Sequence, residues 1–276
     1  MYRNSPIMTI PFHKLHGAKN DFLLTWLEDA PSGLSEMRLP EIAVAISDRY
    51  TGVGADGWML VDRTPGSGFD ASIRLFNSDG SEPELSGNGT RCAAALLARN
   101  NPGRTEFRIR TGAGIKNLRL LSHAGCHYEF EMKMGEARIT ELHATVQGRD
   151  AVIVDVGNPQ CVMPVTDFDF DWAAVGAATE RDPRFPNRTN VSFIRPVDAN
   201  NIEVRFWERG AGLTNSSGTG STGAAAAALA RGLVMAPVSV QTPAGILVLR
   251  VENNALFLTG PAEMTAEGLY YSSNDF

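Results

Sequence analysis

Cysteine is scarce in this sequence of 276 residues, which contains only Cys92, Cys126 and Cys161. Three scattered cysteines do not make a disulfide framework, and neither they nor the five histidines have the spacing of a metal site. No run of about 18 apolar residues is present, which argues against a membrane-spanning helix. The formal net charge is −6, so the chain also lacks the basic excess that nucleic acids and anionic membranes attract.

The N-terminal segment lacks the continuous apolar stretch of a secretory signal peptide and instead carries Arg3, Asn4 and two prolines. Hydrophobic residues make up 43% of the chain and charged residues 20%, a composition that supports a sizeable core. The length corresponds to two domains at about 150 residues each. These features predict a cytoplasmic protein of two domains without a nucleic-acid or membrane partner.

The sequence contains one internal repeat. The segment SGNGT at residues 86–90 recurs 131 positions later as SGTGS at residues 217–221, and each copy leads into an alanine-rich stretch. The same offset takes TGAGI at 111–115 to TPAGI at 242–246, and Asn77 to Glu208. A single repeat of this length predicts two similar domains, because a solenoid needs three or more short units.

Each half has the same predicted order of elements. Helices are predicted at 36–48 and 169–180, strands at 72–76 and 202–207, and alanine-rich helices at 92–99 and 223–231. Period-two alternation then predicts strands within 107–121, 128–134, 238–251 and 255–258, with further strands at 152–156 and 191–195. Glycine and asparagine clusters predict hairpin turns near residues 125, 200 and 254. The predicted fold class is therefore α+β, with mainly antiparallel strands and one buried helix per half.

Both glycine-rich loops place a serine and glycines directly before a helix. Free backbone N–H groups and the positive end of the helix dipole make such a position an anion site for a carboxylate or phosphate. The simpler interpretation is that Ser86 and Ser217 are only helix N-caps. The duplication of the loop, with a polar residue nine positions before each serine, favours a ligand site.

Six segments carry a resemblance to a known family: HGAKNDF, GVGADG, FNSDGSEPELSGNGTRC, VGNPQC, NRTNVSF and ERGAGLTNSSGTGSTGAA. In this order, and over nearly the whole chain, they resemble the diaminopimelate epimerase family. The resemblance implies two pseudo-symmetric domains, each with strands wrapped around a central helix, in a cofactor-independent homodimer. The domains are placed at residues 8–135 and 136–264, and the resemblance implies that 265–276 return to the first. The implied reaction interconverts LL- and meso-diaminopimelate in lysine and peptidoglycan-precursor biosynthesis.

The resemblance also implies roles for individual residues. Asn20 would lie beside the reacting centre, and Glu208 near the substrate amine. The reacting carboxylate would be bound at the two helix ends by Gly87, Asn88, Gly218 and Thr219. The distal amino-acid end would be held by Asn77, Asn158, Asn190 and Arg209, for which a bidentate arginine–carboxylate contact is well suited.

The departures from the family concern the acid–base groups. Where the family has two cysteine thiols that remove and return the α-proton, this sequence has Ser86 and Ser217. Gln160 replaces a family histidine and Leu213 a glutamate. An alkoxide costs roughly 10 kcal/mol more to form than a thiolate, which excludes the usual two-thiol mechanism. The candidate catalytic residues are therefore Ser86, Ser217, Glu208 and Gln160.

Four hypotheses follow from these departures. In the first, which we favour, the chain is a diaminopimelate epimerase whose serines act with a neighbouring base, for which Glu208 is the acidic candidate. In the second it is a related isomerase with a single carboxylate acid–base group. In the third it is a catalytically silent binder of diaminopimelate or a similar amino acid. The fourth, deliberate replacement of both cysteines, is disfavoured because Gln160 and Leu213 also differ.

Overall fold

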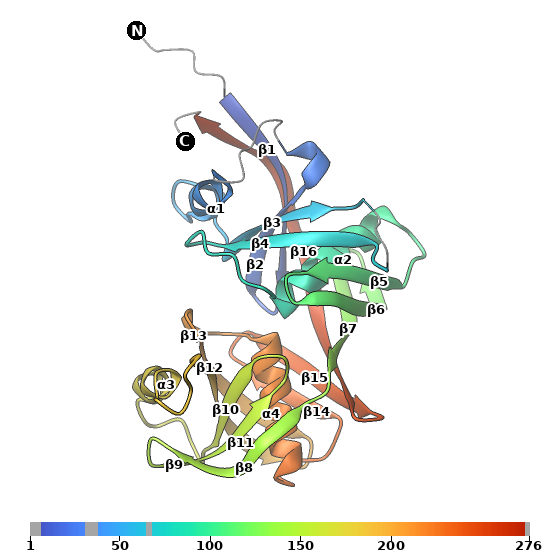
Figure 1. Cartoon of the computed structure of the whole chain (residues 1–276). Helices are drawn as coiled ribbons and strands as arrows, with labels where there is room; N and C mark the ends of the chain where they lie inside the picture. The colour runs from blue at the N-terminus through green and yellow to red at the C-terminus, as the bar shows by residue number, and fades with distance from the viewer. Residues whose placement is uncertain (1–6, 31–37, 65–67, 274–276) are drawn as a thin grey trace. The chain divides into compact units, whose positions relative to one another are not determined.

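The computed structural model describes residues 7–30, 38–64 and 68–273 and divides into two compact units (Figure 1). The first unit consists of Met1–Phe130 and Pro261–Phe276, and the second of Glu131–Gly260. The chain leaves the first unit within strand β7 (His127–Gly135) and returns to it within strand β16 (Ala255–Ser273). Among the described residues, no helix is long and apolar enough to cross a membrane.

The first unit is a ring of strands around helix α2 (Gly87–Asn100). The strand order runs from β1 to β7 and then to β16, and β1 also pairs with β16, which closes the ring. Its other strands are β1 (Ile7–Gly17), β2 (Asn20–Trp26), β3 (Gly57–Asp62), β4 (Ala71–Asn77), β5 (Glu106–Thr111) and β6 (Gly114–Ala124). A short 3₁₀ helix, η1 (Leu27–Asp29), follows β2, and helix α1 (Leu39–Ser47) packs against β3 and β4.

The second unit builds a similar sheet around helix α4 (Gly218–Ala230). Its strands are β8 (Arg138–Val146), β9 (Arg149–Asp155), β10 (Pro159–Pro164), β11 (Asn190–Asp198), β12 (Asn201–Glu208), β13 (Gly212–Thr214), β14 (Val238–Thr242) and β15 (Gly245–Glu252). They follow the order β16-β15-β14-β12-β11-β10-β9-β8, with β13 paired to β12. Helix α3 (Trp172–Glu180) packs against β11 and β12.

The two central helices are buried because their side chains are small. In α4 all five alanines from Ala224 to Ala228 lie in the core of the second unit, surrounded by valines and leucines of the strands. In α2 the residues from Gly87 to Ala98 are all buried. A helix without a polar face can be enclosed by a sheet, and alanine allows the strands to approach it closely.

The repeat predicted from the sequence is confirmed in the pairing of the strands. β4 pairs in parallel with β5, and β12 pairs in parallel with β14. The register is also the same at the predicted offset, because Ala71 pairs with Ile109 and Ile202 pairs with Val240. The predicted α+β class and the strands wrapped around a central helix are likewise confirmed.

Several predicted bounds need correction. Each of the two long alternating stretches is a hairpin, since β5 and β6 turn at residues 112–113 and β14 and β15 turn at residues 243–244. Helix α3 begins three residues later than predicted because the side chain of Asp171 caps it by accepting from the N–H of Ala174 (2.9 Å). The start of the helix predicted at 36–48 lies partly outside the described residues, and the described helix begins at Leu39. The predicted hairpin turns near residues 125, 200 and 254 are confirmed.

Six strands were not predicted, namely β1, β2, β3, β8, β10 and β13. In β2 and β3 almost every described side chain is buried or half-buried, so neither strand alternates between apolar and polar residues. Period-two alternation indicates only strands with one solvent-facing side. Strands that are covered on both faces are therefore not detected by this pattern.

Trp58 is expected to be a major stabilising residue of the first unit. It is fully buried, donates from Nε1 to Thr25 Oγ1 (2.9 Å) and stacks on Phe76. Trp58→Ala should lower the free energy of unfolding by about 3–5 kcal/mol, because it leaves a large cavity and removes the hydrogen bond that Thr25 Oγ1 accepts. Urea denaturation followed by circular dichroism measures this. Tyr50→Ala, at a side chain that is 97% exposed, should change the value by less than about 0.5 kcal/mol.

Candidate active site

Both serines of the repeat cap their helices. The N–H of Gly89 donates to Ser86 Oγ and the N–H of Gly220 donates to Ser217 Oγ, each at 3.1 Å. Both serines are thus helix N-caps. A cap of this kind satisfies only one of the amides in the first turn, and the two amides before it have no intrahelical acceptor. Each helix end therefore keeps backbone donors for an anion.

In the first unit, a tight hairpin places Asn20 beside the start of α2. Ala18 and Lys19 form the turn between β1 and β2 with φ of 50° and 60°, a conformation that is unfavourable for residues other than glycine. Gly17 lies so close to α2 that a Cβ there would be 3.1 Å from the carbonyl oxygen of Asn88. The turn thus brings the side chains of Asn20 and Asn88 into contact, with 3.3 Å between Asn88 Nδ2 and Asn20 Oδ1.

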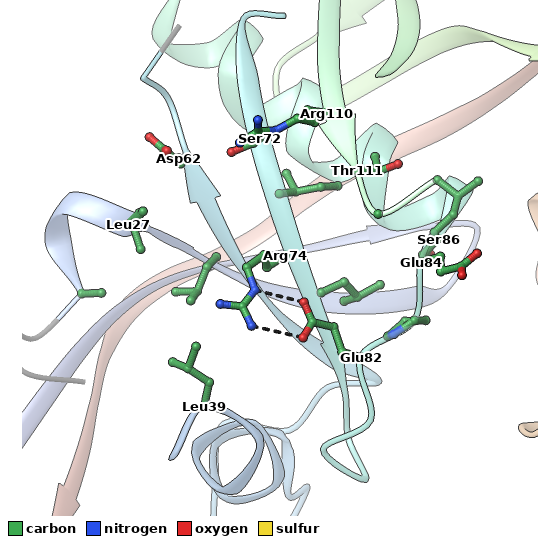
Figure 2. Close-up of a pocket in the computed structure, with 17 residues that line it drawn as sticks. Leu27, Leu39, Asp62, Ser72, Arg74, Glu82, Glu84, Ser86, Arg110 and Thr111 are labelled. Carbon is green, nitrogen blue, oxygen red and sulfur yellow. Dashed lines mark hydrogen bonds and ion pairs between the residues drawn. The ribbon is translucent and has the colours of Figure 1, made fainter. Parts of the chain in front are cut away.

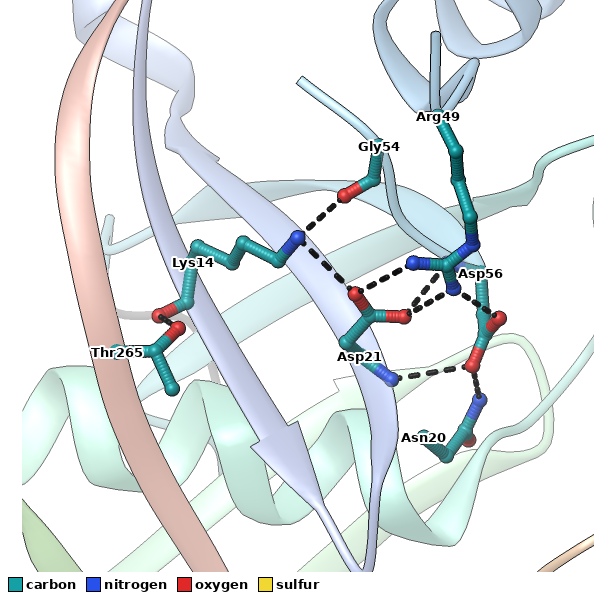
Figure 3. Close-up of polar contacts among 7 residues, drawn as sticks. All are labelled: Lys14, Asn20, Asp21, Arg49, Gly54, Asp56 and Thr265. Carbon is teal, nitrogen blue, oxygen red and sulfur yellow. Dashed lines mark hydrogen bonds and ion pairs between the residues drawn. The ribbon is translucent and has the colours of Figure 1, made fainter. Parts of the chain in front are cut away.

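The Asn20 side chain is anchored by a cluster of charged groups on the same side of the unit (Figure 3). Asn20 Nδ2 donates to Asp56 Oδ2 at 2.7 Å, and Arg49 bonds to both Asp56 and Asp21. Lys14 forms a further ion pair with Asp21 at 3.1 Å. Although burial raises the pKa of Asp21, its bonds to Arg49 and Lys14 hold that pKa below the usual value. The Asp21 carboxylate is therefore a structural anion and a weak base.

Asn77 and Ser86 lie at opposite ends of the loop that follows β4. Asn77 Nδ2 donates to Ser81 Oγ (2.9 Å). Ser86 borders a cavity of about 810 Å³ in the first unit, whose walls include many aliphatic side chains of β3, β4 and η1. Figure 2 shows Arg74 and Glu82 forming a bidentate ion pair in this cavity, with distances of 3.0 and 3.1 Å. Among the described residues, no acceptor for the Ser86 hydroxyl hydrogen is present.

In the second unit, the serine hydroxyl has a carboxylate partner. Ser217 Oγ donates to Glu208 Oε2 at 2.8 Å, which joins the end of β12 to the first turn of α4. Burial raises the pKa of Glu208, an effect that the hydrogen bond from Ser217 only partly opposes. A carboxyl group with a raised pKa at a helix N-terminus is a suitable proton acceptor near neutral pH.

Three further predicted residues of this unit meet at the start of α4. Asn158 Nδ2 approaches Thr219 Oγ1 (3.3 Å), and Gln160 Nε2 donates to Asn158 Oδ1 (2.8 Å). Gln160 is fully buried against Gly223, where a Cβ would lie 2.9 Å from the Gln160 Cγ. Gln160 therefore orients Asn158, and its neutral amide is neither an acid nor a base near neutral pH.

Asn190 and Arg209 form a second polar group of this unit. The Asn190 side chain accepts from the N–H of Arg209 (3.0 Å) and donates to the carbonyl of Pro159 (3.1 Å). The guanidinium of Arg209 donates to the carbonyl of Asn187 and is exposed. These bonds fix the backbone around Arg209 while its side chain stays accessible to a ligand.

None of the three cysteines caps either central helix. Cys92 and Cys161 are buried, and burial raises the pKa of each thiol to about 12. Cys126 is exposed in the turn between β6 and β7. Within the part of the chain that the structure describes, no three His, Cys, Asp or Glu residues are grouped so that they could hold a metal ion.

Comparison with known proteins assigns the family. The sequence profile described as diaminopimelate epimerase matches residues 12–140 and 152–265. The chain belongs to the diaminopimelate epimerase family. It is 37% identical to the diaminopimelate epimerase of Microcystis aeruginosa over 95% of this chain and 99% of that one. Identity to the enzyme of Bacillus subtilis is 33%, over 94% of this chain and 98% of that one.

Solved structures with the same fold are more distant. A predicted epimerase from Pseudomonas aeruginosa has a TM-score of 0.70 at 17% identity and covers 94% of this chain and 98% of its own. A hydroxyproline epimerase from Agrobacterium vitis has a TM-score of 0.69 at 14% identity and covers 100% of this chain and 95% of its own. These similarities support the fold that the diaminopimelate epimerase family resemblance implied.

The structure adds residues to those that the family motifs suggested. Asp56 and Asp21 lie within the quoted motifs but were not selected, although they hold Asn20 in place. Arg91 was also missed, and its side chain bonds to Asn88. The sequence did contain a signal for Arg91, because it is a charged residue directly before the run of small and apolar residues from Cys92 to Ala98. Leu213, which replaces a family glutamate, is exposed on β13.

Proposed function

We propose that this protein interconverts LL- and meso-diaminopimelate by removing and returning the proton on the α-carbon, without a cofactor. The observation that carries the proposal is the hydrogen bond between Ser217 and Glu208 at the start of α4. It places a carboxylate with a raised pKa beside one of the two positions where the family has its thiols.

In this proposal Glu208 is the base and Ser217 orients it. A serine alkoxide is too costly to form, whereas a partly desolvated carboxylate accepts a proton near neutral pH. The proton of the α-carbon passes to Glu208, either directly or by way of the Ser217 hydroxyl, which donates its own proton to Glu208 at the same time. Glu208 then exchanges its proton with solvent, and return of a proton to the opposite face of the α-carbon gives the other epimer.

The binding residues in this proposal follow the family positions. The reacting carboxylate takes the free amides at the helix ends, with Gly87, Asn88, Gly218 and Thr219. Arg209 pairs with the distal carboxylate, and the distal end also contacts Asn77, Asn158 and Asn190. Support comes from the half-buried or buried state of these asparagines and from the exposed guanidinium of Arg209.

A second candidate function is a binder of diaminopimelate that does not react with it. The observation in its favour is the helix end of the first unit, where the Ser86 hydroxyl has no carboxylate acceptor among the described residues. Gln160, which lies beside the start of α4, also stands where the family has a histidine.

The exchange of the α-proton with D₂O, followed by ¹H NMR on LL- and meso-diaminopimelate, tests the two functions against each other. Loss of the α-proton signal together with formation of the other epimer is the expected result. Binding without any exchange would establish the binder instead. If only another amino acid exchanged its α-proton, the proposed substrate would be contradicted and the proposed type of reaction would be supported.

We also propose that the active form is a cytoplasmic homodimer. The support is the family resemblance, together with the composition of the chain. Size-exclusion chromatography with light scattering gives the molar mass: about twice 29.8 kDa is expected for the dimer, and 29.8 kDa would contradict it.

A further inference from the structure

Arg91 is a fully buried cation on the second turn of α2. Its Nε donates to the carbonyl of Pro261 (3.2 Å) and its Nη2 donates to Oδ1 of Asn88. Nη1 has no hydrogen-bond partner among the described residues. Burial lowers the pKa of Arg91 to about 10, so the guanidinium still carries its charge at neutral pH. A buried charge whose partners are all neutral oxygens is costly to the fold.

The contact with Arg91 determines which way the amides of Asn88 and Asn20 point. A guanidinium only donates, so it requires the oxygen of the Asn88 amide to face it. The nitrogen of that amide then faces Asn20 Oδ1, and the nitrogen of Asn20 faces Asp56 Oδ2. Arg91 thereby holds the amide of Asn88, in the first turn of α2, in one orientation.

The second unit has no such cation at the equivalent place. The offset of the repeat takes Arg91 to Thr222, whose hydroxyl donates to the carbonyl of Gly218 (2.8 Å). The carboxylate of Glu208 stands beside the start of α4 instead. The start of α2 thus carries a buried positive charge, and the start of α4 carries an acidic group. An anionic ligand group is therefore favoured more at the first than at the second.

We infer that Arg91 is the positioning residue of an anion site at the start of α2: it orients Asn88 and supplies the charge that the α-carboxylate of an amino acid neutralises. The inference deepens the proposed function and rests on it for the identity of the ligand. It adds Arg91 to the residues of the proposed carboxylate site at the start of α2 and keeps Glu208 as the base.

Two substitutions at Arg91 distinguish the effect of its charge on ligand binding from the effect of its hydrogen-bond geometry. Arg91→Gln removes the charge and keeps an amide donor for Asn88. Arg91→Lys keeps the charge and loses the planar arrangement of guanidinium donors. Isothermal titration calorimetry with diaminopimelate should give a Kd about 10- to 100-fold higher for Arg91→Gln, and a Kd within about fivefold of the wild type for Arg91→Lys. Arg99→Gln, on the exposed side of α2 where Arg99 pairs with Glu267, is the matched control and should leave Kd unchanged.

Thermal unfolding with and without diaminopimelate distinguishes a positioning role from a merely structural one. The rise in Tm that saturating ligand produces should be strongly reduced in Arg91→Gln and retained in Arg91→Lys. A lower Tm of the free Arg91→Gln protein with an unchanged Kd would overturn the inference. So would a Kd of Arg91→Lys raised as much as that of Arg91→Gln, because the charge would then be irrelevant.

An NMR measurement on the wild type keeps the inference testable if Arg91→Gln does not fold. The Nε–Hε signal of Arg91, assigned with Arg91→Lys, should shift when diaminopimelate or acetate is added. A constant signal in a protein that exchanges the α-proton of diaminopimelate would overturn the inference and leave the proposed function standing. A shift with acetate but not with diaminopimelate would support the anion site and contradict the proposed substrate. No shift with either would overturn the anion site.

Discussion

Replacing both Ser86 and Ser217 by cysteine is expected to raise the rate of diaminopimelate epimerisation by about 10²- to 10⁴-fold. A thiol at a helix N-terminus forms a thiolate far more readily than a hydroxyl forms an alkoxide. Both serines already cap their helices through Oγ, with 3.1 Å to the amide of the third helical residue. A cysteine sulfur would therefore occupy the start of the helix without any change of the backbone.

The rate is measured by the conversion of LL- to meso-diaminopimelate on a chiral column. The single variants Ser86→Cys and Ser217→Cys show which helix end limits the reaction, and the first should gain more because Ser86 has no carboxylate partner among the described residues. Ser239→Cys, on β14, adds a thiol elsewhere and should have no effect. No gain in the double variant would contradict the view that only the thiols are missing and would direct attention to Gln160 or to another substrate.

Glu208→Gln is expected to reduce α-proton exchange by about 10²- to 10⁴-fold, because it removes the carboxylate base that lies at the start of α4. The substitution keeps the size of the side chain and leaves an oxygen to accept from Ser217. Exchange into D₂O by NMR, with Kd measured in parallel, separates loss of chemistry from loss of binding. Glu203→Gln on the same strand, which loses a bond to Arg195, is the matched control and should retain exchange.

The pH dependence provides a second check on Glu208. Exchange should increase with pH through a single ionisation above the usual glutamate range, since burial raises the pKa of this carboxyl group. The folded protein then binds more protons than the unfolded chain between the usual and the raised pKa, so stability should fall as the pH rises through that interval. Glu208→Gln should abolish this contribution to the decrease in stability with pH. An exchange rate that does not change with pH, or an active Glu208→Gln, would exclude Glu208 as the base.

Local features of the fold were predictable because they depend on short stretches of sequence. The N-caps at Ser86 and Ser217, the central helices and the alternating strands each follow from propensity and periodicity within about 15 residues. The repeat predicted the duplication, and the structure shows it in the pairing of Ala71 with Ile109 and Ile202 with Val240. Strands covered on both faces were missed because they have no alternation to detect.

The candidate site was predictable only as a set of residues, and its bonds were not. Asn20 contacts Asn88 across 68 positions of the chain, and Arg91 contacts Pro261 across 170. Such contacts depend on how the ring of strands closes around α2, which includes the pairing of β1 with β16. Sequence patterns indicate periodicity and local propensity, and they do not indicate which distant strands pair to close a sheet.

The sequence by itself determined the family, the duplicated architecture and the loss of both thiols. Only the tertiary structure decided what takes their place, because it alone brings Glu208 within 2.8 Å of Ser217 and leaves Ser86 without a carboxylate partner among the described residues. It also decided the charge at each helix end, with Arg91 buried at α2 and Glu208 beside α4. Burial and distance fix the pKa of a group and the partner of a charge, and both are properties of the folded chain.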